Sequence, residues 1–412
     1  MMAKRNIIVG QSGGPTAVIN SSLAGVYKTA RERGFHTVYG MLHGIQGLLD
    51  EQYVDLSTQI HSDMDIELLK RTPSAFLGSC RYKLPEIHED MEIYEKIFAI
   101  LDKLEIEVFI YIGGNDSMDT IKKLSDYAIV KGHSQKFLGV PKTIDNDLAL
   151  TDHTPGFGSA AKYIAASTKE IIRDALGLAY KKDMITIIEI MGRNAGWLTG
   201  ATALAKTEEC DGPDLIYLPE VPFDIEKFRD KVKELLKQKQ SIIIAVSEGI
   251  KLPDGRYVCE LSGGADYVDP FGHKQLAGTA AYLAGFLAAE IGCKTRGIEF
   301  STLQRSASHM ASRVDIDEAF MVGGAAVKAA DEGDTGKMVV IDRLSDDPYM
   351  STAGIYDVHK IANNEKLVPR SWMNEDASYV TDEFINYIEP LIQGDYTPFM
   401  VNGLPQHLVL KR

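Results

Sequence analysis

Acidic residues and a lysine follow two consecutive apolar runs of this sequence. Asp116 follows one run, and Asp145 and Asp147 follow the next, with Lys142 close by. Carboxylates that meet at one edge can hold Mg²⁺ or accept the proton of an attacking hydroxyl, and a lysine can neutralise the charge of a transferred phosphoryl group. The spacing leaves plainer alternatives open, because Asp116 could cap a helix and Lys142 could form a surface ion pair.

Glycine-rich turns lie next to these charged residues. Ser12-Gly13-Gly14 follows the first apolar run of the chain, and Gly113-Gly114-Asn115 leads to Asp116. Such turns can bring backbone N–H groups close to an anion, and a helix that starts there adds a favourable dipole. Pro15 is expected in the first turn of that helix. A tight turn that needs glycine only for its backbone angles is the alternative. The absence of a GxxxxGK[ST] motif argues against a P-loop.

Alternating strand and helix patterns must position these turns. Six apolar runs predict strands buried on both faces, at residues 7–9, 108–112, 137–140, 185–190, 242–246 and 338–341. Helical patterns cover residues 17–33, 91–104, 117–130, 159–176, 225–237 and 274–291. This alternation predicts the α/β class, with mostly parallel sheets covered on both sides. Ligands bind beyond the carboxyl ends of such strands, where five of these runs are followed by glycines, acids or a base.

Length, charge and cysteine usage narrow the class of protein. The 412 residues suggest two domains, and the breaker Pro155-Gly156-Phe157-Gly158 suggests a domain change near residues 151–158. A net charge of −14 argues against nucleic acid or an anionic membrane as partner. The four scattered cysteines predict free thiols in a reducing compartment. With no signal-peptide core and no apolar stretch long enough to span a bilayer, a cytoplasmic protein is expected.

Five ordered motifs give the sequence a specific resemblance. They are residues 76–81 (FLGSCR), 143–147 (TIDND), 191–193 (MGR), 247–249 (SEG) and 303–305 (LQR). In order and approximate spacing they resemble the phosphofructokinase family, over about residues 5 to 345. The resemblance implies two αβα sandwich domains with the active site in the cleft between them. Residues 1–156 plus about 313–375 would bind the phosphoryl donor, and residues 157–312 plus about 376–412 the sugar phosphate. It also implies a homodimer or homotetramer.

The resemblance also implies residue roles. Asp145 would accept the proton of the 1-hydroxyl of fructose 6-phosphate, and Lys142, Asp116 and Arg81 would assist the transfer. Gly13 and Gly114 would bind the donor together with Lys142 and Asp116, Gly13 through its backbone. Mg²⁺ would lie near Asn115 and Asp116. The sugar phosphate would be held by Thr143, Asp145, Met191, Gly192, Arg193, Glu248, Thr302, Arg305 and His309, with Arg305 also a candidate for the neighbouring subunit's site.

Two positions indicate the donor. Relatives that use ATP usually carry glycine at the positions of Asp116 and Lys142, whereas relatives that use pyrophosphate resemble this chain. An aspartate side chain would fill and repel the site of a nucleotide α-phosphate, and Lys142 would stabilise the shorter inorganic donor. The expected reaction is reversible transfer from pyrophosphate to fructose 6-phosphate, giving fructose 1,6-bisphosphate and phosphate, in glycolysis or gluconeogenesis. An ATP-dependent 6-phosphofructokinase and a catalytically silent regulatory subunit are the alternatives.

Three positions depart from the family pattern. Asn115 stands where an aspartate associated with Mg²⁺ is usual, so the metal is expected to arrive on pyrophosphate or to lean on Asp116. Met184 stands at the place of a cross-subunit arginine, and Lys181, Lys182, His309 or Arg313 are the candidates to replace it. Thr302 stands where an aromatic residue or histidine is common.

Overall fold

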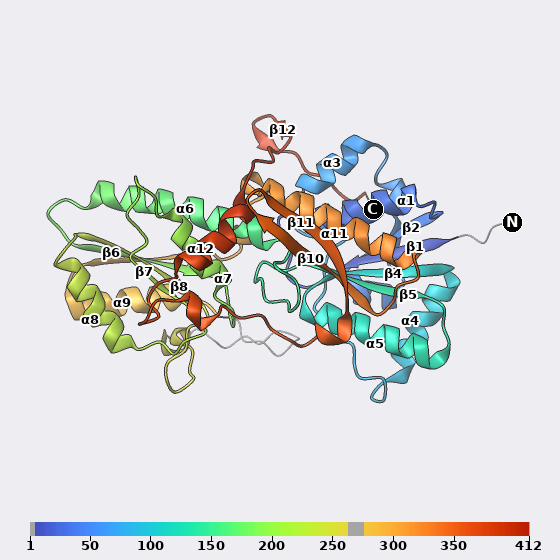
Figure 1. The fold of residues 1–412 in the computed structure, drawn as a ribbon, viewed down its shortest axis with the longest axis horizontal. Coiled ribbons are helices and arrows are strands. Elements are labelled where there is room, and N and C mark those ends of the chain that lie inside the picture. Colours follow the sequence, from blue (N-terminus) through green and yellow to red (C-terminus); the bar gives the residue numbers. More distant parts are fainter. Residues whose placement is uncertain (1–4, 263–275, 412) are drawn as a thin grey trace.

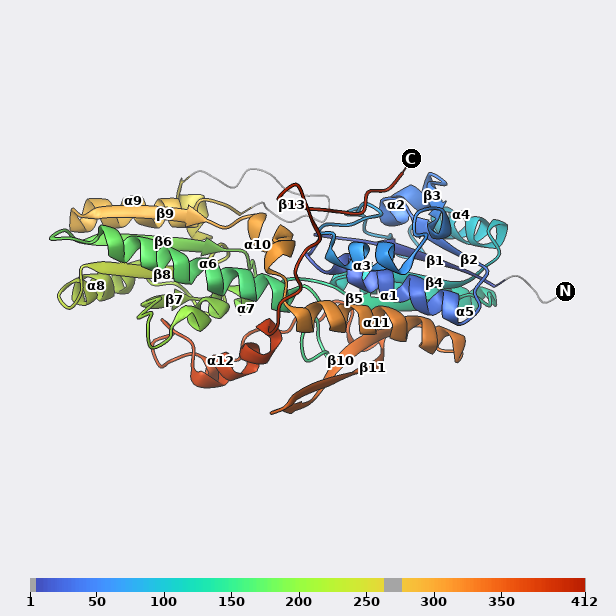
Figure 2. The ribbon, with the colours of Figure 1, turned by 90° about the horizontal axis from the view of Figure 1, so that it is seen from above.

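Two mostly parallel sheets organise the chain in the computed structural model, which describes residues 5–262 and 276–411. The larger sheet has seven strands in the order β11-β10-β5-β4-β1-β2-β3, and the smaller has four in the order β7-β8-β6-β9. Figures 1 and 2 show them in two lobes that lie side by side. The strands of the larger sheet are β1 (Asn6–Gln11), β2 (Thr37–Met41), β3 (Tyr53–Asp55), β4 (Ile106–Gly113), β5 (Lys136–Pro141), β10 (Lys337–Asp346) and β11 (Tyr349–Asp357). Those of the smaller sheet are β6 (Met184–Ile190), β7 (Leu215–Tyr217), β8 (Ser241–Ser247) and β9 (Lys294–Glu299).

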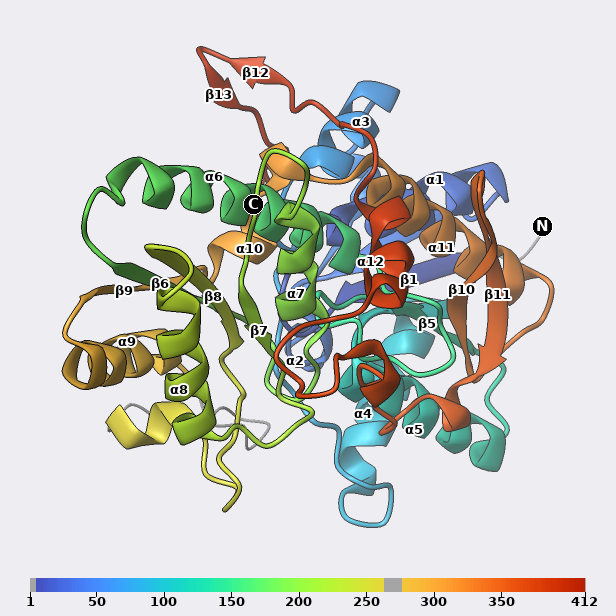
Figure 3. The same cartoon turned by 60° about the vertical axis from the view of Figure 1, so that its left-hand side comes forward.

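All six predicted strands are confirmed, as parts of β1, β4, β5, β6, β8 and β10. Only β2–β3 and β10–β11 pair antiparallel within these sheets. The sequence did not indicate β2 or any of the four edge strands. Of these edge strands, β3 and β7 have three residues each, and β9 and β11 have polar, partly exposed sequences. Short or polar strands at a sheet edge carry little of the apolar signal that marks a buried strand. A small ribbon, β12 (Met400–Val401) with β13 (Leu404–Pro405), projects from the lobes in Figure 3.

The helices cover both faces of each sheet. They are α1 (Ile19–Glu32), α2 (Gly44–Leu49), α3 (Asp63–Arg71), α4 (Met91–Lys103), α5 (Asn115–Lys131), α6 (Phe157–Leu178), α7 (Trp197–Gly200), α8 (Ile225–Leu236), α9 (Thr279–Ile291), α10 (Leu303–Ser306), α11 (Arg313–Asp331) and α12 (Asp382–Ile388). Every predicted helix is confirmed, with shifted ends. The predicted start at Lys274 lies outside the described residues, and α9 begins at Thr279 after Gly278, whose φ of +91° only glycine adopts readily.

Successive residues of the central strands point into separate apolar cores. In β1, Ile7 and Val9 enter the core beneath α1 and α11, whereas Ile8 enters the core beneath α4 and α5. This alternation is the reason that the strands read as continuous apolar runs. The smaller sheet likewise separates a core with α6 and α12 from one with α8 and α9. The α/β class with layers on both faces is therefore confirmed.

The chain crosses between the lobes four times. After β5, residues 142–156 lead into α6, and α11 later returns the chain to the larger sheet. There α11 packs closely on α1, since a Cβ on Gly25 of α1 would lie only 2.1 Å from the carbonyl oxygen of Phe320. After β11 the chain crosses again to reach α12, as Figure 1 shows, and Leu408 and Leu410 pack back against the core of the larger sheet. The assignment of these segments to a donor domain and a sugar-phosphate domain stays a prediction.

The expected free thiols are confirmed at Cys80, Cys210, Cys259 and Cys293, whereas the reducing compartment stays a prediction. Among the described residues, none of the helices combines the length and the apolar character needed to cross a membrane.

Candidate active site

A cleft of about 930 Å³ lies at the carboxyl ends of strands from both sheets. Its walls follow β1, β4 and β5 on one side and β6 and β8 on the other. Most of the predicted site residues line it: Gly13, Arg81, Gly114, Asn115, Asp116, Lys142, Thr143, Asp145, Met191, Arg193, Glu248 and Arg305. Gly192, Thr302 and His309 are not among its lining residues.

The turn after β1 is shaped around a lysine. Gly13 has a φ of +76°, and a Cβ at this position would lie 3.1 Å from Lys142 Nζ, which donates to the carbonyl oxygen of Gly14 at 2.7 Å. The Gly13 N–H already donates to the carbonyl oxygen of Cys80 at 3.1 Å. Glycine is therefore required here for backbone angle and for close approach, and a donor contact through its N–H stays a prediction. The expectation for Pro15 is wrong, because α1 begins only at Ile19.

Lys142 is a cation inside the cleft wall rather than on the surface. Lys142 is only 3% exposed, and this burial lowers the pKa of its ammonium group to about 8. The positive charges of Arg305 and Arg81 lower the pKa further, whereas the Asp145 carboxylate raises it. A lysine with a lowered pKa at the base of a cleft can lose or keep its charge near physiological pH.

The amino terminus of α5 faces the same side of the cleft. Gly114 precedes the helix in an extended conformation, and Asn115 and Asp116 form its first turn. The alternative in which Asp116 caps the helix is thus wrong, because Gly114 occupies the cap position and no side chain caps it. The first N–H groups of a helix have no intrahelical partner and attract anions, so this turn favours a phosphate ligand.

The loop after β5 holds its carboxylates by short-range hydrogen bonds. Thr143 Oγ1 accepts from the Asp145 N–H at 3.0 Å and donates to Asp145 Oδ2 at 3.2 Å. Burial raises the pKa of Asp145, while the Thr143 hydrogen bond and the cations Lys142 and Arg193 oppose that rise. Burial and the nearby Asp145 raise the pKa of Asp147 to about 7. Paired, desolvated carboxylates of this kind can take up a proton from a substrate hydroxyl.

The opposite wall is formed by the turns after β6 and β8. The Met191 N–H donates to Gln304 Oε1 at 3.3 Å, and the Gly192 N–H donates to Glu248 Oε1 at 3.4 Å. Gly192 thus lies behind the wall and holds Glu248 rather than lining the cleft. Burial raises the pKa of Glu248 to about 8, so its carboxyl group is mostly protonated at pH 7 before a ligand binds.

Arg305 reaches across the cleft of its own chain. It lies on α10 in the smaller lobe, yet a Cβ on Gly14 of the larger lobe would lie 3.0 Å from its Nη1 atom. Thr302 and His309 are exposed and do not enter this cleft. Their contact with a sugar phosphate stays a prediction, and the structure of one chain gives it no support.

Met184 and the neighbouring candidates Lys181 and Lys182 lie at the end of β6 away from the cleft of their own chain. Met184 begins β6, and Met191 follows the other end of this seven-residue strand, a distance of about 20 Å at 3.3 Å per residue. Lys181 and Lys182 precede Met184 and are exposed. A role for them in phosphate binding would therefore be at another subunit's site.

The residues of the cleft fit a Mg²⁺ ion that is held mainly by the phosphates of a bound substrate, with few oxygens from the protein. No group of three or more His, Cys, Asp or Glu that could hold a metal occurs among residues 5–262 and 276–411. The Asn115 Oδ1 atom, however, is buried with no hydrogen-bond partner within that part of the chain, and Asp116 lies beside it in the cleft. Mg²⁺ commonly takes one or two protein oxygens and completes its shell with water and substrate phosphates.

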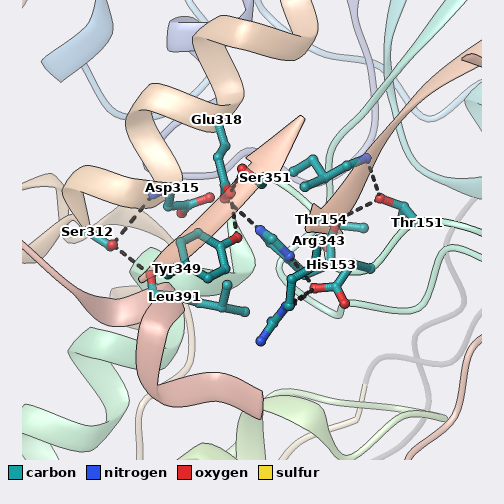
Figure 4. Close-up of polar contacts among 12 residues, drawn as sticks. Thr151, His153, Thr154, Ser312, Asp315, Glu318, Arg343, Tyr349, Ser351 and Leu391 are labelled. Carbon is teal, nitrogen blue, oxygen red and sulfur yellow. Dashed lines mark hydrogen bonds and ion pairs between the residues drawn. The ribbon is translucent and has the colours of Figure 1, made fainter. Parts of the chain in front are cut away.

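A buried polar cluster lies at the far end of the loop that carries Asp145. His153 contacts Glu318 at 2.6 Å through Nε2 and Asp152 at 2.8 Å through Nδ1, and Tyr349 Oη donates to Glu318 Oε1 at 2.6 Å (Figure 4). Although burial disfavours the charged imidazole, these two carboxylates raise the pKa of His153 to about 9. Arg343 of β10 donates to Asp152 Oδ1 at 3.0 Å. The cluster ties the loop to α11 and β10.

Several lining residues were not predicted from the sequence. They include Glu189, whose pKa burial raises to about 7, together with Asn194 and residues 363–365. Asn194 stands next to the motif at residues 191–193, which is a local signal. Residues 363–365 lie more than 200 positions from the other donor-side residues, and nothing in their own sequence links them to the cleft.

Two α/β lobes that enclose lysine, arginine and carboxylate side chains above a helix amino terminus define a protein that binds phosphorylated ligands. The family model described as Phosphofructokinase matches residues 6–330, and the chain belongs to the phosphofructokinase family.

Known relatives and a solved structure are similar to this chain over almost its whole length. The chain is 41% identical to the pyrophosphate–fructose 6-phosphate 1-phosphotransferase of Halomonas elongata, covering 98% of this chain and 96% of the relative. It is also 41% identical to the enzyme of the same name from Xanthomonas campestris, covering 100% and 97%. The crystal structure of a pyrophosphate-dependent phosphofructokinase from Nitrosospira multiformis matches with a TM-score of 0.90 and 37% identity, covering 99% of this chain and 97% of that one.

Proposed function

We propose that this chain transfers a phosphoryl group from pyrophosphate to the 1-hydroxyl of fructose 6-phosphate, reversibly, giving fructose 1,6-bisphosphate and phosphate. The observation that carries the proposal is that Asp116 and Lys142 line the same side of the cleft, with Asp145. The names of the relatives from Halomonas elongata and Xanthomonas campestris support the same donor and acceptor.

Asp145 is proposed as the base. It accepts the proton of the 1-hydroxyl as the hydroxyl oxygen bonds to the transferred phosphorus, and the bond from phosphorus to the bridging oxygen breaks to release phosphate. Its hydrogen bond with Thr143 orients the carboxylate, and the positive charges of Lys142 and Arg193 oppose the rise in its pKa that burial causes. The same groups serve the reverse direction, in which Asp145 returns the proton.

Donor preference is proposed to depend on a charge pattern. Lys142 Nζ is held by Gly14 and can neutralise negative charge that shifts to the donor oxygens, together with Arg81 and the N–H groups of α5. Asp116 places a carboxylate in the first turn of α5, where a longer donor would extend beyond two phosphates. Fructose 6-phosphate is proposed to contact Met191, Arg193, Glu248 and Arg305.

Magnesium is the proposed cofactor, with Asn115 Oδ1 and Asp116 as the protein oxygens near it. When bound, Mg²⁺ neutralises charge on pyrophosphate and on the transferring group. A cytoplasmic homodimer or homotetramer remains the expectation for the assembly, as does the division into a donor domain (residues 1–156 plus about 313–375) and a sugar-phosphate domain (157–312 plus about 376–412).

A coupled assay tests the proposal. Purified chain is given fructose 6-phosphate, Mg²⁺ and either pyrophosphate or ATP, and fructose 1,6-bisphosphate is followed through aldolase. Turnover with pyrophosphate and little with ATP is expected. Turnover with ATP alone would replace the proposal by an ATP-dependent enzyme, and no turnover with either donor would favour a silent regulatory subunit.

A further inference from the structure

A segment far along the chain lies between the catalytic loops. After β11 the chain leaves the larger lobe and runs across to α12 in the smaller one, as Figure 1 shows. Residues 363–366, here named the crossing segment, occupy the middle of this path, and residues 363–365 line the cleft. The family match ends at residue 330, so the crossing segment lies beyond it.

The crossing segment first contacts the donor side. Asn115 Nδ2 donates to the carbonyl oxygen of Asn364 at 3.2 Å, and Asn363 Nδ2 donates to Asp119 Oδ1 on the next turn of α5 at 3.2 Å. Because the Asn115 amide uses its nitrogen in this contact, its oxygen is the atom left for a ligand. The crossing segment therefore fixes which way the Asn115 amide points.

It then pairs with the loop that carries Asp145. The Lys366 N–H donates to the carbonyl oxygen of Asp147 at 2.7 Å, and Glu365 forms an isolated antiparallel bridge with Leu148. Lys366 Nζ donates to Asn146 Oδ1 at 3.2 Å and to the carbonyl oxygens of Thr151 and Asp152 at 3.2 and 2.5 Å.

One lysine thus satisfies three acceptors of this loop. Asn146 is fully buried and has a φ of +54°, a conformation that a non-glycine residue keeps only when its surroundings hold it. Lys366 is one of the groups that hold Asn146 in this conformation, and Asn146 is the residue directly after Asp145.

The third contact is with the sugar-phosphate side. Asn194 Nδ2 donates to Glu365 Oε1 at 3.0 Å, and Trp197 Nε1 donates to the carbonyl oxygen of Lys366 at 2.9 Å. Asn194 is adjacent to Arg193. Four consecutive residues therefore touch the turn with Asn115, the loop with Asp145 and the turn with Arg193.

We propose that the crossing segment is a positioning element of the active site, in which Lys366 sets the place of the Asp145 loop and Glu365 sets the place of the Arg193 turn. The proposal rests on the proposed function for its kinetic consequence. Phosphoryl transfer depends on alignment of donor, acceptor and base, and a displacement of about 1 Å costs about 10²-fold in rate. Residues that hold three loops in register without touching the reacting atoms therefore affect kcat more than KM.

Lys366→Met tests the first half, with Lys360→Met as matched control, since Lys360 is an exposed lysine earlier on the same path. We expect kcat of Lys366→Met to fall by about 10²-fold, with KM for pyrophosphate and for fructose 6-phosphate within about threefold of wild type. Lys366→Arg should recover at least a tenth of the wild-type kcat because a guanidinium can also donate to several carbonyl groups. Lys360→Met should behave as wild type.

Glu365→Ala tests the second half, with exposed Glu375→Ala as control. The alanine variant should lose about tenfold in kcat, whereas Glu365→Gln, which keeps an acceptor for Asn194, should stay within about threefold of wild type. If Glu365 acts through Asn194, adding Asn194→Ala to Glu365→Ala should lower kcat no further than Asn194→Ala alone.

A measurement without substrate separates this proposal from the proposed function. Amide hydrogen exchange should rise in Lys366→Met at residues 146–152 and in Glu365→Ala at residues 192–196, and neither control should show it. A wild-type chain inactive with pyrophosphate would refute the proposed function and leave the exchange result to decide on the crossing segment. Unchanged exchange together with unchanged kcat, or equal losses in the controls, would overturn the proposal. If Lys366→Met does not fold, Glu365→Ala at its exposed position decides.

Discussion

Replacing Lys142 with methionine removes one buried cation and keeps most of the side-chain volume. In the wild type, Nζ lies 2.7 Å from the Gly14 carbonyl oxygen and would be 3.1 Å from a Cβ on Gly13, so it occupies the narrow space between the turn and the cleft. A preorganised charge in such a site is worth ~3–4 kcal/mol to a transition state that gathers negative charge. The expected loss in kcat for Lys142→Met is therefore about 10²–10³-fold.

The dependence of activity on pH tests the charge of Lys142 independently of the substitution. The pKa of Lys142 is lowered to about 8 by burial, so its positive charge is lost as the pH rises through 8. Because kcat/KM reports groups of the free enzyme, kcat/KM for pyrophosphate should fall above pH 8. Bound pyrophosphate is an anion that favours the ammonium form, so the decline of kcat itself should lie at higher pH.

The assay is phosphate release from pyrophosphate at saturating fructose 6-phosphate, between pH 6 and 10, for wild type and Lys142→Met. The variant should keep only its residual activity and should lack the decline near pH 8. A variant whose kcat remains within about fivefold of wild type, with the decline still present, would refute the role given to Lys142.

Three further outcomes are expected. Asp116→Gly combined with Lys142→Gly should lower turnover with pyrophosphate and admit measurable turnover with ATP in the coupled assay; no gain with ATP would contradict the steric role of Asp116. Glu248→Gln should keep KM for fructose 6-phosphate within about fivefold of wild type at pH 7, because the pKa near 8 already leaves this carboxyl protonated there, whereas a rise of 50-fold or more would show that the bound sugar requires the carboxylate. His153 gains a raised pKa from Glu318 and Asp152, so its stabilisation is complete below pH 6.5 and disappears as the pH passes 9; a change from 6.5 to about 9 corresponds to about 3 kcal/mol. The thermal midpoint should accordingly fall from pH 6.5 to 9.5 in wild type, and a His153→Gln variant with the same fall would contradict this.

Local patterns of apolar residues predicted the strands that are buried on both faces. The central strands carry apolar residues on both faces, and their runs marked β1, β4, β5, β6, β8 and β10. Edge strands such as β9 gave no such signal, since half of their side chains meet solvent. Helix starts were predicted less well. Pro15 has the right type for a first turn and Asp116 for a cap, but α1 begins only at Ile19 and Gly114 occupies the cap position of α5.

Motifs that come directly after strands predicted residues that line the cleft, and their roles stay predictions. Asp116, Lys142, Asp145, Arg193 and Glu248 all line the cleft, because parallel strands end at one edge of the sheet and bring the loops that leave them to that edge. Contacts between residues far apart in the sequence could not be predicted from local sequence patterns. Lys366 contacts Asn146 from 220 positions away, and its neighbours in sequence give no sign of that meeting. The polar cluster at His153 depends in the same way on α11 and β10 arriving from the second half of the chain.

Donor choice is tested most directly by competition in one tube. The chain is mixed with fructose 6-phosphate, Mg²⁺ and equal concentrations of pyrophosphate and ATP, and ³¹P resonances are followed over time. The pyrophosphate signal should decline, with phosphate and the 1-phosphate of fructose 1,6-bisphosphate rising in equal amounts, while the ATP signals stay constant. Consumption of ATP with formation of ADP and an unchanged pyrophosphate signal would contradict the function proposed for Asp116 and Lys142.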